Sequence, residues 1–114
     1  MATNTLTKIF QYQMTNSDAQ VYLCPALTTA VITALYKTNA DTSDRTFRLH
    51  QVNGGGSSTA SNALYYDEPI ATKRLHPRVD SGIILEAGQS LRGLASANSA
   101  VTITGFGILI EESA

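Results

Sequence analysis

The sequence predicts an all-β fold, a single antiparallel β-sandwich or jelly-roll of about eight strands, and two observations lead to this prediction. Gly and Pro divide the 114 residues into short runs, and almost every run alternates in polarity or is rich in β-branched and aromatic residues. These runs recur at spacings of roughly 8–14 residues, with no long helical pattern among them. The length suits one domain and no linker divides the chain, so residues 1–114 are expected to form one sandwich.

The first two candidate strands lie at residues 7–14 and 20–24, and the second is followed by Pro25, which cannot donate to a sheet ladder. Residues 1–19 as a whole have two interpretations. They are either a strand of the sandwich or an N-terminal arm that adds to the sheet of a neighbouring molecule.

Residues 28–38 form the longest apolar run and are expected to be a central strand with both faces buried. A helix is the competing interpretation, but the many β-branched residues in this run disfavour it. Strict alternation places Val31, Thr33 and Leu35 on one face and Ile32 on the opposite face.

Residues 45–52 alternate cleanly and are expected to be a half-buried strand. Phe47 and Leu49 share one face, while Arg48 and His50 share the other face, next to water. The following stretch, 53–62, is rich in Gly and Ser and is expected to be a flexible surface loop.

The second half of the chain contains shorter runs. Candidate strands lie at residues 63–69, 72–79, 83–85, 90–96 and 100–110. Pro77 makes the second of these an edge-like strand. Between the third and fourth, residues 86–89 form a tight turn in which Gly88 supplies the positive φ angle.

Composition excludes several function classes. A net charge of −1 disfavours nucleic-acid binding, which normally requires a basic excess. The single cysteine, Cys24, excludes an intrachain disulfide and a Cys-based zinc cluster, and a buried inert thiol is expected. No stretch is apolar and long enough for a membrane span, and the first residues do not have the pattern of a secretion signal.

No candidate catalytic, cofactor or metal site emerges from the motifs, so we expect a protein that is not an enzyme and has no cofactor. His50 and His76 are the only histidines and are expected at the surface or at a sheet edge, without a third metal ligand nearby. Asp41 and Asp44 could offer oxygen ligands to Ca²⁺, but two aspartates in a turn more often bond their own backbone. The glycines at 54–56 are not followed by the Lys-Ser/Thr of a phosphate-binding loop.

Two groups of residues are candidates for partner binding. Arg74, His76 and Arg78 share one face of their strand, as either a solvated edge that resists pairing or a docking patch for an acidic protein surface. Tyr65 and Tyr66 are adjacent and therefore face opposite sides, so at most one belongs to the core. The other is a candidate contact for a protein or a sugar ring.

Two parts of the chain carry a recognisable pattern. In the first half it comprises residues 21–35 (VYLCPALTTAVITAL), Asn39 and residues 45–50 (RTFRLH), and in the second half residues 83–96 (IILEAGQSLRGLAS) and 100–107 (AVTITGFG). In these segments the chain resembles a family of small β-sandwich virion proteins of tailed bacteriophages. Two turn positions depart from the family pattern. Gln89 replaces the usual acidic residue, and Leu27 occupies a position that is often Gly.

The resemblance implies a structural protein of the phage virion, located on the head surface after assembly in the host cytoplasm. We expect a capsid decoration (cement) protein that binds the major capsid protein and bridges its subunits. Homo-oligomers are expected, with a trimer matching the three-fold positions of a capsid, and neither nucleic acid nor membrane is an expected partner. The alternative is an accessory module of a tail or fibre, which would bind host-surface carbohydrate through Tyr65 or Tyr66, or another tail protein.

Overall fold

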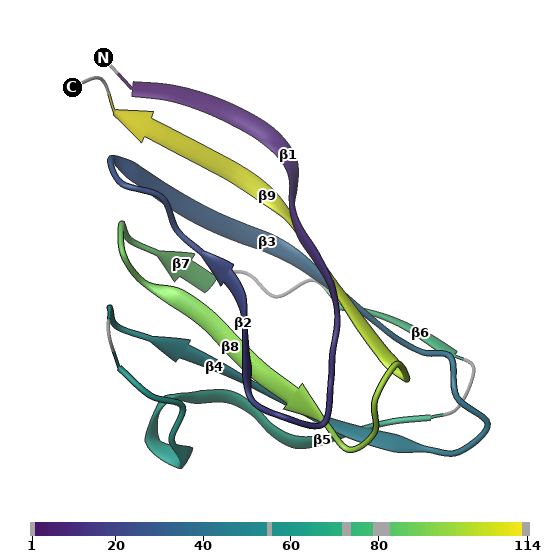
Figure 1. The fold of residues 1–114 in the computed structure, drawn as a ribbon. Helices are drawn as coiled ribbons and strands as arrows, with labels where there is room; N and C mark the ends of the chain where they lie inside the picture. The colour runs from purple at the N-terminus through teal and green to yellow at the C-terminus, as the bar shows by residue number, and fades with distance from the viewer. Residues whose placement is uncertain (1, 55, 72–73, 79–82, 113–114) are drawn as a thin grey trace.

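The computed structural model describes residues 2–54, 56–71, 74–78 and 83–112, and this part of the chain forms a β-sandwich (Figure 1). The strands are β1 (Ala2–Gln13), β2 (Ala19–Leu23), β3 (Thr28–Asn39), β4 (Arg45–Val52), β5 (Ala63–Ile70), β6 (Arg74–Arg78), β7 (Ile83–Leu85), β8 (Ser90–Ala95) and β9 (Val101–Glu112). One short 3-10 helix, η1 (Ala60–Asn62), precedes β5. None of the described helices has the length and apolar character needed to cross a membrane.

Two sheets pack against each other, and every strand pairing is antiparallel. The first sheet has the order β1-β9-β3-β6, with β7 also paired to β3, and the second has the order β2-β8-β4-β5. Strands β6 and β7 lie one after the other along the same side of β3, so the sandwich has eight strand positions, four in each sheet. This confirms the prediction of an all-β sandwich.

The strand partners follow a simple rule along the chain. In five of the pairings, β1 joins β9, β2 joins β8, β3 joins both β6 and β7, and β4 joins β5, so early strands pair with late strands in reverse order. This is the pairing of one long hairpin whose two arms are wound together, and successive pairs fall alternately in the first and second sheet. Such a winding is the jelly roll that the strand rhythm predicts.

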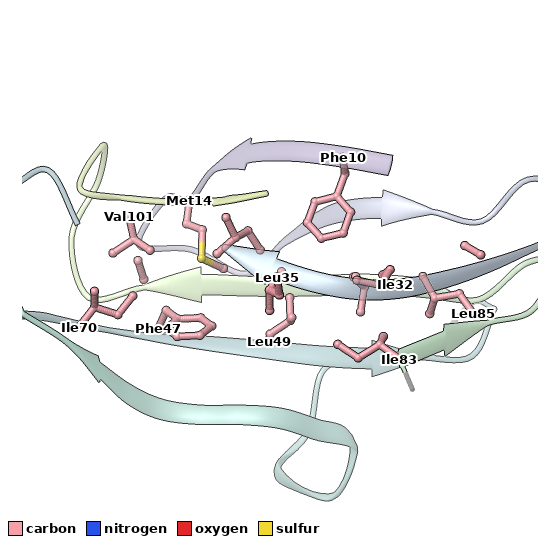
Figure 2. Close-up of a cluster of buried hydrophobic side chains, with 14 of the residues drawn as sticks. Phe10, Met14, Ile32, Leu35, Phe47, Leu49, Ile70, Ile83, Leu85 and Val101 are labelled. Carbon is pink, nitrogen blue, oxygen red and sulfur yellow. The ribbon is translucent and has the colours of Figure 1, made fainter. Parts of the chain in front are cut away.

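The core lies between the sheets (Figure 2). Phe47 and Leu49 of β4 face Ile32 and Leu35 of β3, and all four side chains are fully buried. Further buried residues extend this cluster along the sandwich: Phe10, Met14, Cys24, Ile70, Ile83, Leu85, Leu91, Val101 and Ile103. The segment at the N-terminus takes part in the sandwich, because β1 pairs with β9 of the same chain and contributes Phe10 to this core.

The two faces of β3 differ from the alternation expected from the sequence. The pairing with β9 shifts register between Ile32 and Ala34, and Thr33 at this point is exposed. Because a bulge adds one residue to a strand, it brings Ile32 and Leu35 onto the same inner face. The prediction that Leu35 shares a face with Val31, opposite Ile32, is therefore wrong.

Two of the residues with a left-handed backbone lie in turns next to β7 and β3. Gly88 has φ +86°, as predicted for the turn after β7. Leu27, in the turn before β3, has φ +59°, a conformation that costs a residue with a Cβ atom roughly 1–2 kcal/mol. A glycine, which has no Cβ atom, would adopt this conformation without that cost.

Replacing Leu27 by glycine is therefore expected to raise the free energy of unfolding by about 0.5 kcal/mol. Relief of the left-handed strain exceeds the entropy that glycine adds to the unfolded chain, and the half-exposed leucine side chain loses little packing. Urea unfolding monitored by circular dichroism measures the change. The control is Ala26→Gly in the same turn, where φ is not positive and a loss of stability is expected. A loss in Leu27→Gly as well would contradict the strain argument.

Candidate functional site

The basic candidates lie on β6, which forms an edge of the first sheet. The backbone register pairs His76 with Lys37 and Arg78 with Leu35. The side chains of Arg74, His76 and Arg78 lie outside the described part of the chain, so their role in partner binding stays a prediction. Their place on an edge strand agrees with the edge-like character predicted from Pro77.

The adjacent tyrosines point to opposite sides, as the alternation predicts. Tyr65 is half-buried and its ring lies 5.1 Å from the ring of Phe47, on the inner side of β5. Tyr66 is 51% exposed on the outer side of the second sheet. Of the two candidates, Tyr66 is therefore the one that a partner molecule can reach.

Tyr66 belongs to a cluster of polar residues on this outer side. The Arg48 guanidinium lies 4.1 Å from the centre of the Tyr66 ring and donates two hydrogen bonds to the Asp67 carboxylate, at 2.7 and 3.2 Å. These hydrogen bonds hold the pKa of Asp67 below its usual value. Asp67 has φ +53°, and β4 and β5 shift register next to it, so a bulge brings the carboxylate toward Arg48.

His50 is not at the surface, and the sequence prediction for it is wrong. Its side chain is only 4% exposed, because residues 56–62 fold back over this part of the second sheet. The Nδ1–H group of His50 donates to Asn62 Oδ1 at 2.9 Å, and Asn62 Nδ2 donates to the Ser57 carbonyl at 2.9 Å. Hydrogen bonds thus tie this segment, expected as a flexible surface loop, to the sheet.

Between this segment and the sheet lies a groove of about 270 Å³. Its walls include Asp18, Arg48, His50, Ser58, Tyr66 and Leu94. The charges in the walls are compensated, since Asp18 pairs with Arg92 at 2.9 Å and accepts a hydrogen bond from Ser58, while Arg48 pairs with Asp67. The groove therefore suits a small neutral molecule with hydroxyl groups better than an ion.

The outer face of the first sheet carries a band of apolar side chains. The register aligns Leu6, Ile108, Val31 and Ile84 in one row across β1, β9, β3 and β7, which we call the apolar row. Leu6 is 80% exposed and Ile84 is 49% exposed. Phe106 lies two residues before Ile108 on the same face and is 38% exposed. Exposed apolar patches are typical of surfaces that contact other proteins, so this row is a candidate contact surface.

Lys37 is a feature that sequence reasoning missed. Although charged, it is only 3% exposed, and its Nζ atom lies 4.6 Å from the ring centre of Tyr65 and 5.6 Å from that of Phe47. The favourable interaction of a cation with aromatic rings contributes to holding it there. The alternation of β3 after its bulge could have indicated this inward position, but only with the bulge known.

The other candidate residues, Cys24 and Asp41, interact with neighbouring groups of the chain itself. Burial raises the pKa of the Cys24 thiol, whose Sγ atom lies 3.2 Å from the Thr28 carbonyl oxygen, so the expectation of a buried thiol is confirmed. Asp41 accepts hydrogen bonds from the Thr42 backbone N–H and from Arg45. Within the described residues, no cluster of three or more His, Cys, Asp or Glu side chains is arranged to hold a metal ion.

Comparison with known proteins adds no assignment to this geometry. No model of a known protein family matches the chain, and a search of the curated proteins finds no match.

Proposed function

We propose that this chain is a structural protein of a phage virion, and specifically a capsid decoration protein that binds the outer head surface. The proposal rests on the resemblance of residues 20–110 to small virion β-sandwich proteins and on the apolar outer face of the first sheet. Jelly rolls are frequent in viral capsid proteins, which adds an analogy at the level of the fold alone.

The apolar outer face is the observation that carries the proposal. Leu6, Ile84 and Phe106 expose large apolar side chains on one face of a chain with 15% charged residues and a net charge of −1. A free monomer normally avoids such a surface, whereas a protein that works by contact requires it. The face is thus suited to docking on a capsid protein.

Decoration by this protein would act through interfaces alone. Each copy would bury a modest area on the major capsid protein, and the basic residues Arg74 and Arg78 at the β6 edge would add attraction to an acidic capsid surface. Because one copy that touches two capsid subunits binds both with a high effective concentration, bridging multiplies the stabilisation of the head.

Sedimentation with matching capsids that lack the protein tests this function. We expect saturable binding at a fixed ratio to the major capsid protein and disruption of the decorated heads at a higher temperature. Phe106→Ala should weaken binding by about tenfold, because the aromatic side chain is lost from the docking face. Tyr66→Ala is the matched control on the outer side of the other sheet and should bind like the wild type.

The contribution of the basic edge is tested in the same assay. Arg74→Glu and Arg78→Glu should weaken binding, and more so at low salt. Arg92→Glu makes the same change of charge on β8 of the second sheet, away from the proposed docking face, and should have little effect.

Absence of binding to expanded capsids would overturn the decoration proposal. The groove beside Tyr66 then supports the second candidate, an accessory module of a tail or fibre that binds carbohydrate. Its compensated charges and hydroxyl-bearing walls suit a neutral sugar. A glycan screen would then show binding that Tyr66→Ala abolishes and Tyr65→Ala does not abolish.

A further inference from the structure

Edges of a sheet expose unpaired backbone groups, and three of the four edges of this sandwich carry features that discourage pairing with another chain. β5 contains Pro69 and a bulge at Asp67, where φ is positive. β2 has five residues and a register shift between Gln20 and Tyr22. The edge beside β3 is divided between β6, which contains Pro77, and the three-residue β7.

The fourth edge, β1, has a register shift with β9 between Lys8 and Phe10, but the stretch before this shift is regular. It is 12 residues long and contains no proline, and its register with β9 runs without a shift from Ala2 to Lys8. Lys8 is the only charged residue of the strand. Leu6, in the middle of this regular stretch, is 80% exposed, although a strand edge meant to stay solvated usually carries charges there. Among the described strands, β9 is the one that pairs with β1.

We propose that two copies of this chain pair through their β1 strands, antiparallel about a two-fold axis at Leu6. Each first sheet would then continue into that of the other copy, and the backbone groups along the outer side of β1 would gain hydrogen-bond partners. The two Leu6 side chains would lie opposite each other and lose much of their exposure to water.

The side chains of β1 favour a second copy as the occupant of this edge. With Leu6 opposite Leu6, Thr5 of each copy faces Thr7 of the other, a favourable cross-strand pair. Lys8 faces Asn4, so no like charges meet across the axis. β1 is thus complementary to itself, and a net charge of −1 per chain leaves little repulsion between the copies.

The apolar row provides an independent argument. It crosses the sheet from Ile84 through Val31 and Ile108 and reaches the edge at Leu6, its most exposed member. A second copy related by the two-fold axis would continue the row from Leu6 into its own Leu6 and Ile108. An isologous contact of this kind closes as a dimer, in contrast to the trimer expected from the resemblance.

Analytical ultracentrifugation of the purified full-length chain tests the pairing. The wild type should sediment as a dimer in equilibrium with monomer. Leu6→Lys should raise the dissociation constant by at least about tenfold, because two leucines lose their burial and two like charges meet. Ile84→Lys is the matched control, since it makes the same change in the same row but at the far side of the sheet, and should leave the dimer unchanged.

Cross-linking locates the axis. Leu6→Cys should be joined into a covalent dimer by a short bis-maleimide, whereas Ile84→Cys and the wild type, whose Cys24 is buried, should not. Circular dichroism should show that each variant is folded, as expected for changes at exposed positions.

Three results would overturn the proposal: a wild type that stays monomeric at the highest concentration reached, a trimer, or a dimer that persists in Leu6→Lys without cross-linking at position 6. The measurement uses no capsid, so its outcome is independent of whether the chain decorates a phage head.

Discussion

Replacing Gly107 by alanine is expected to lower the free energy of unfolding by about 3 kcal/mol. Gly107 lies in β9, opposite Ile32 of β3, and a Cβ atom there would collide with the Val31 carbonyl oxygen. It would also come within 2.9 Å of the Val31 carbonyl carbon and 3.0 Å of Ile32 Cα. These are backbone atoms of a central strand, so β3 and β9 must separate before the methyl group fits.

The same substitution at Gly105 provides the comparison. A Cβ atom at Gly105 would meet the ring of Phe10, which belongs to a side chain rather than to the backbone of the sheet. Because a ring can turn aside, Gly105→Ala is expected to lower the free energy of unfolding by only about 1 kcal/mol. Urea unfolding of both variants, monitored by circular dichroism, measures the difference. Equal losses would contradict the assignment of Gly107 to a backbone contact.

Asn39→Ala is the second substitution for which we expect a large effect, a loss of about 3 kcal/mol in the free energy of unfolding. The Asn39 side chain is fully buried at the end of β3. Its Nδ2 group donates to the carbonyl oxygens of Ser43 and Ile70, at 3.0 Å each, and its Oδ1 atom accepts from the Asp41 N–H at 3.0 Å. Alanine would leave three backbone groups without these partners.

Asn98→Ala is the matched control for this prediction. Its Oδ1 atom accepts one hydrogen bond, from the Asn16 N–H at 2.8 Å, and the residue is exposed, so water can replace the lost partner. The expected loss is below about 1 kcal/mol. Thermal and urea unfolding of both variants should give this order. Similar losses would show that the Asn39 side chain does not hold together the ends of β3 and β5 and the turn at 40–44.

Strand positions could be predicted well because their signals are local. The alternation of residues 45–52 and the short apolar run of residues 83–85 match β4 and β7. Pro25 follows the end of β2, and Gly88 has the positive φ that its turn requires. Each of these signals depends on a few neighbouring residues, through side-chain alternation or allowed backbone angles.

Of the candidate site, the sequence could predict only part. It indicated that Tyr65 and Tyr66 face opposite sides, because the period of a strand is two residues. The sequence did not indicate that His50 is buried, because this burial depends on Asn62, a residue of the loop that folds back onto the sheet. It also missed the burial of Lys37, which follows from the bulge in β3.

The sequence by itself determined the fold class, nearly every strand and the low charge of the surface, because patterning and composition are properties of short segments. Only the tertiary structure decided which strands pair, where bulges reverse the faces and how the apolar row forms. Leu6, Val31, Ile84 and Ile108 are far apart along the chain, and the winding of the jelly roll brings them into register. Hydrogen bonds between distant strands set that register. The alternation within one strand does not indicate which other strand pairs with it.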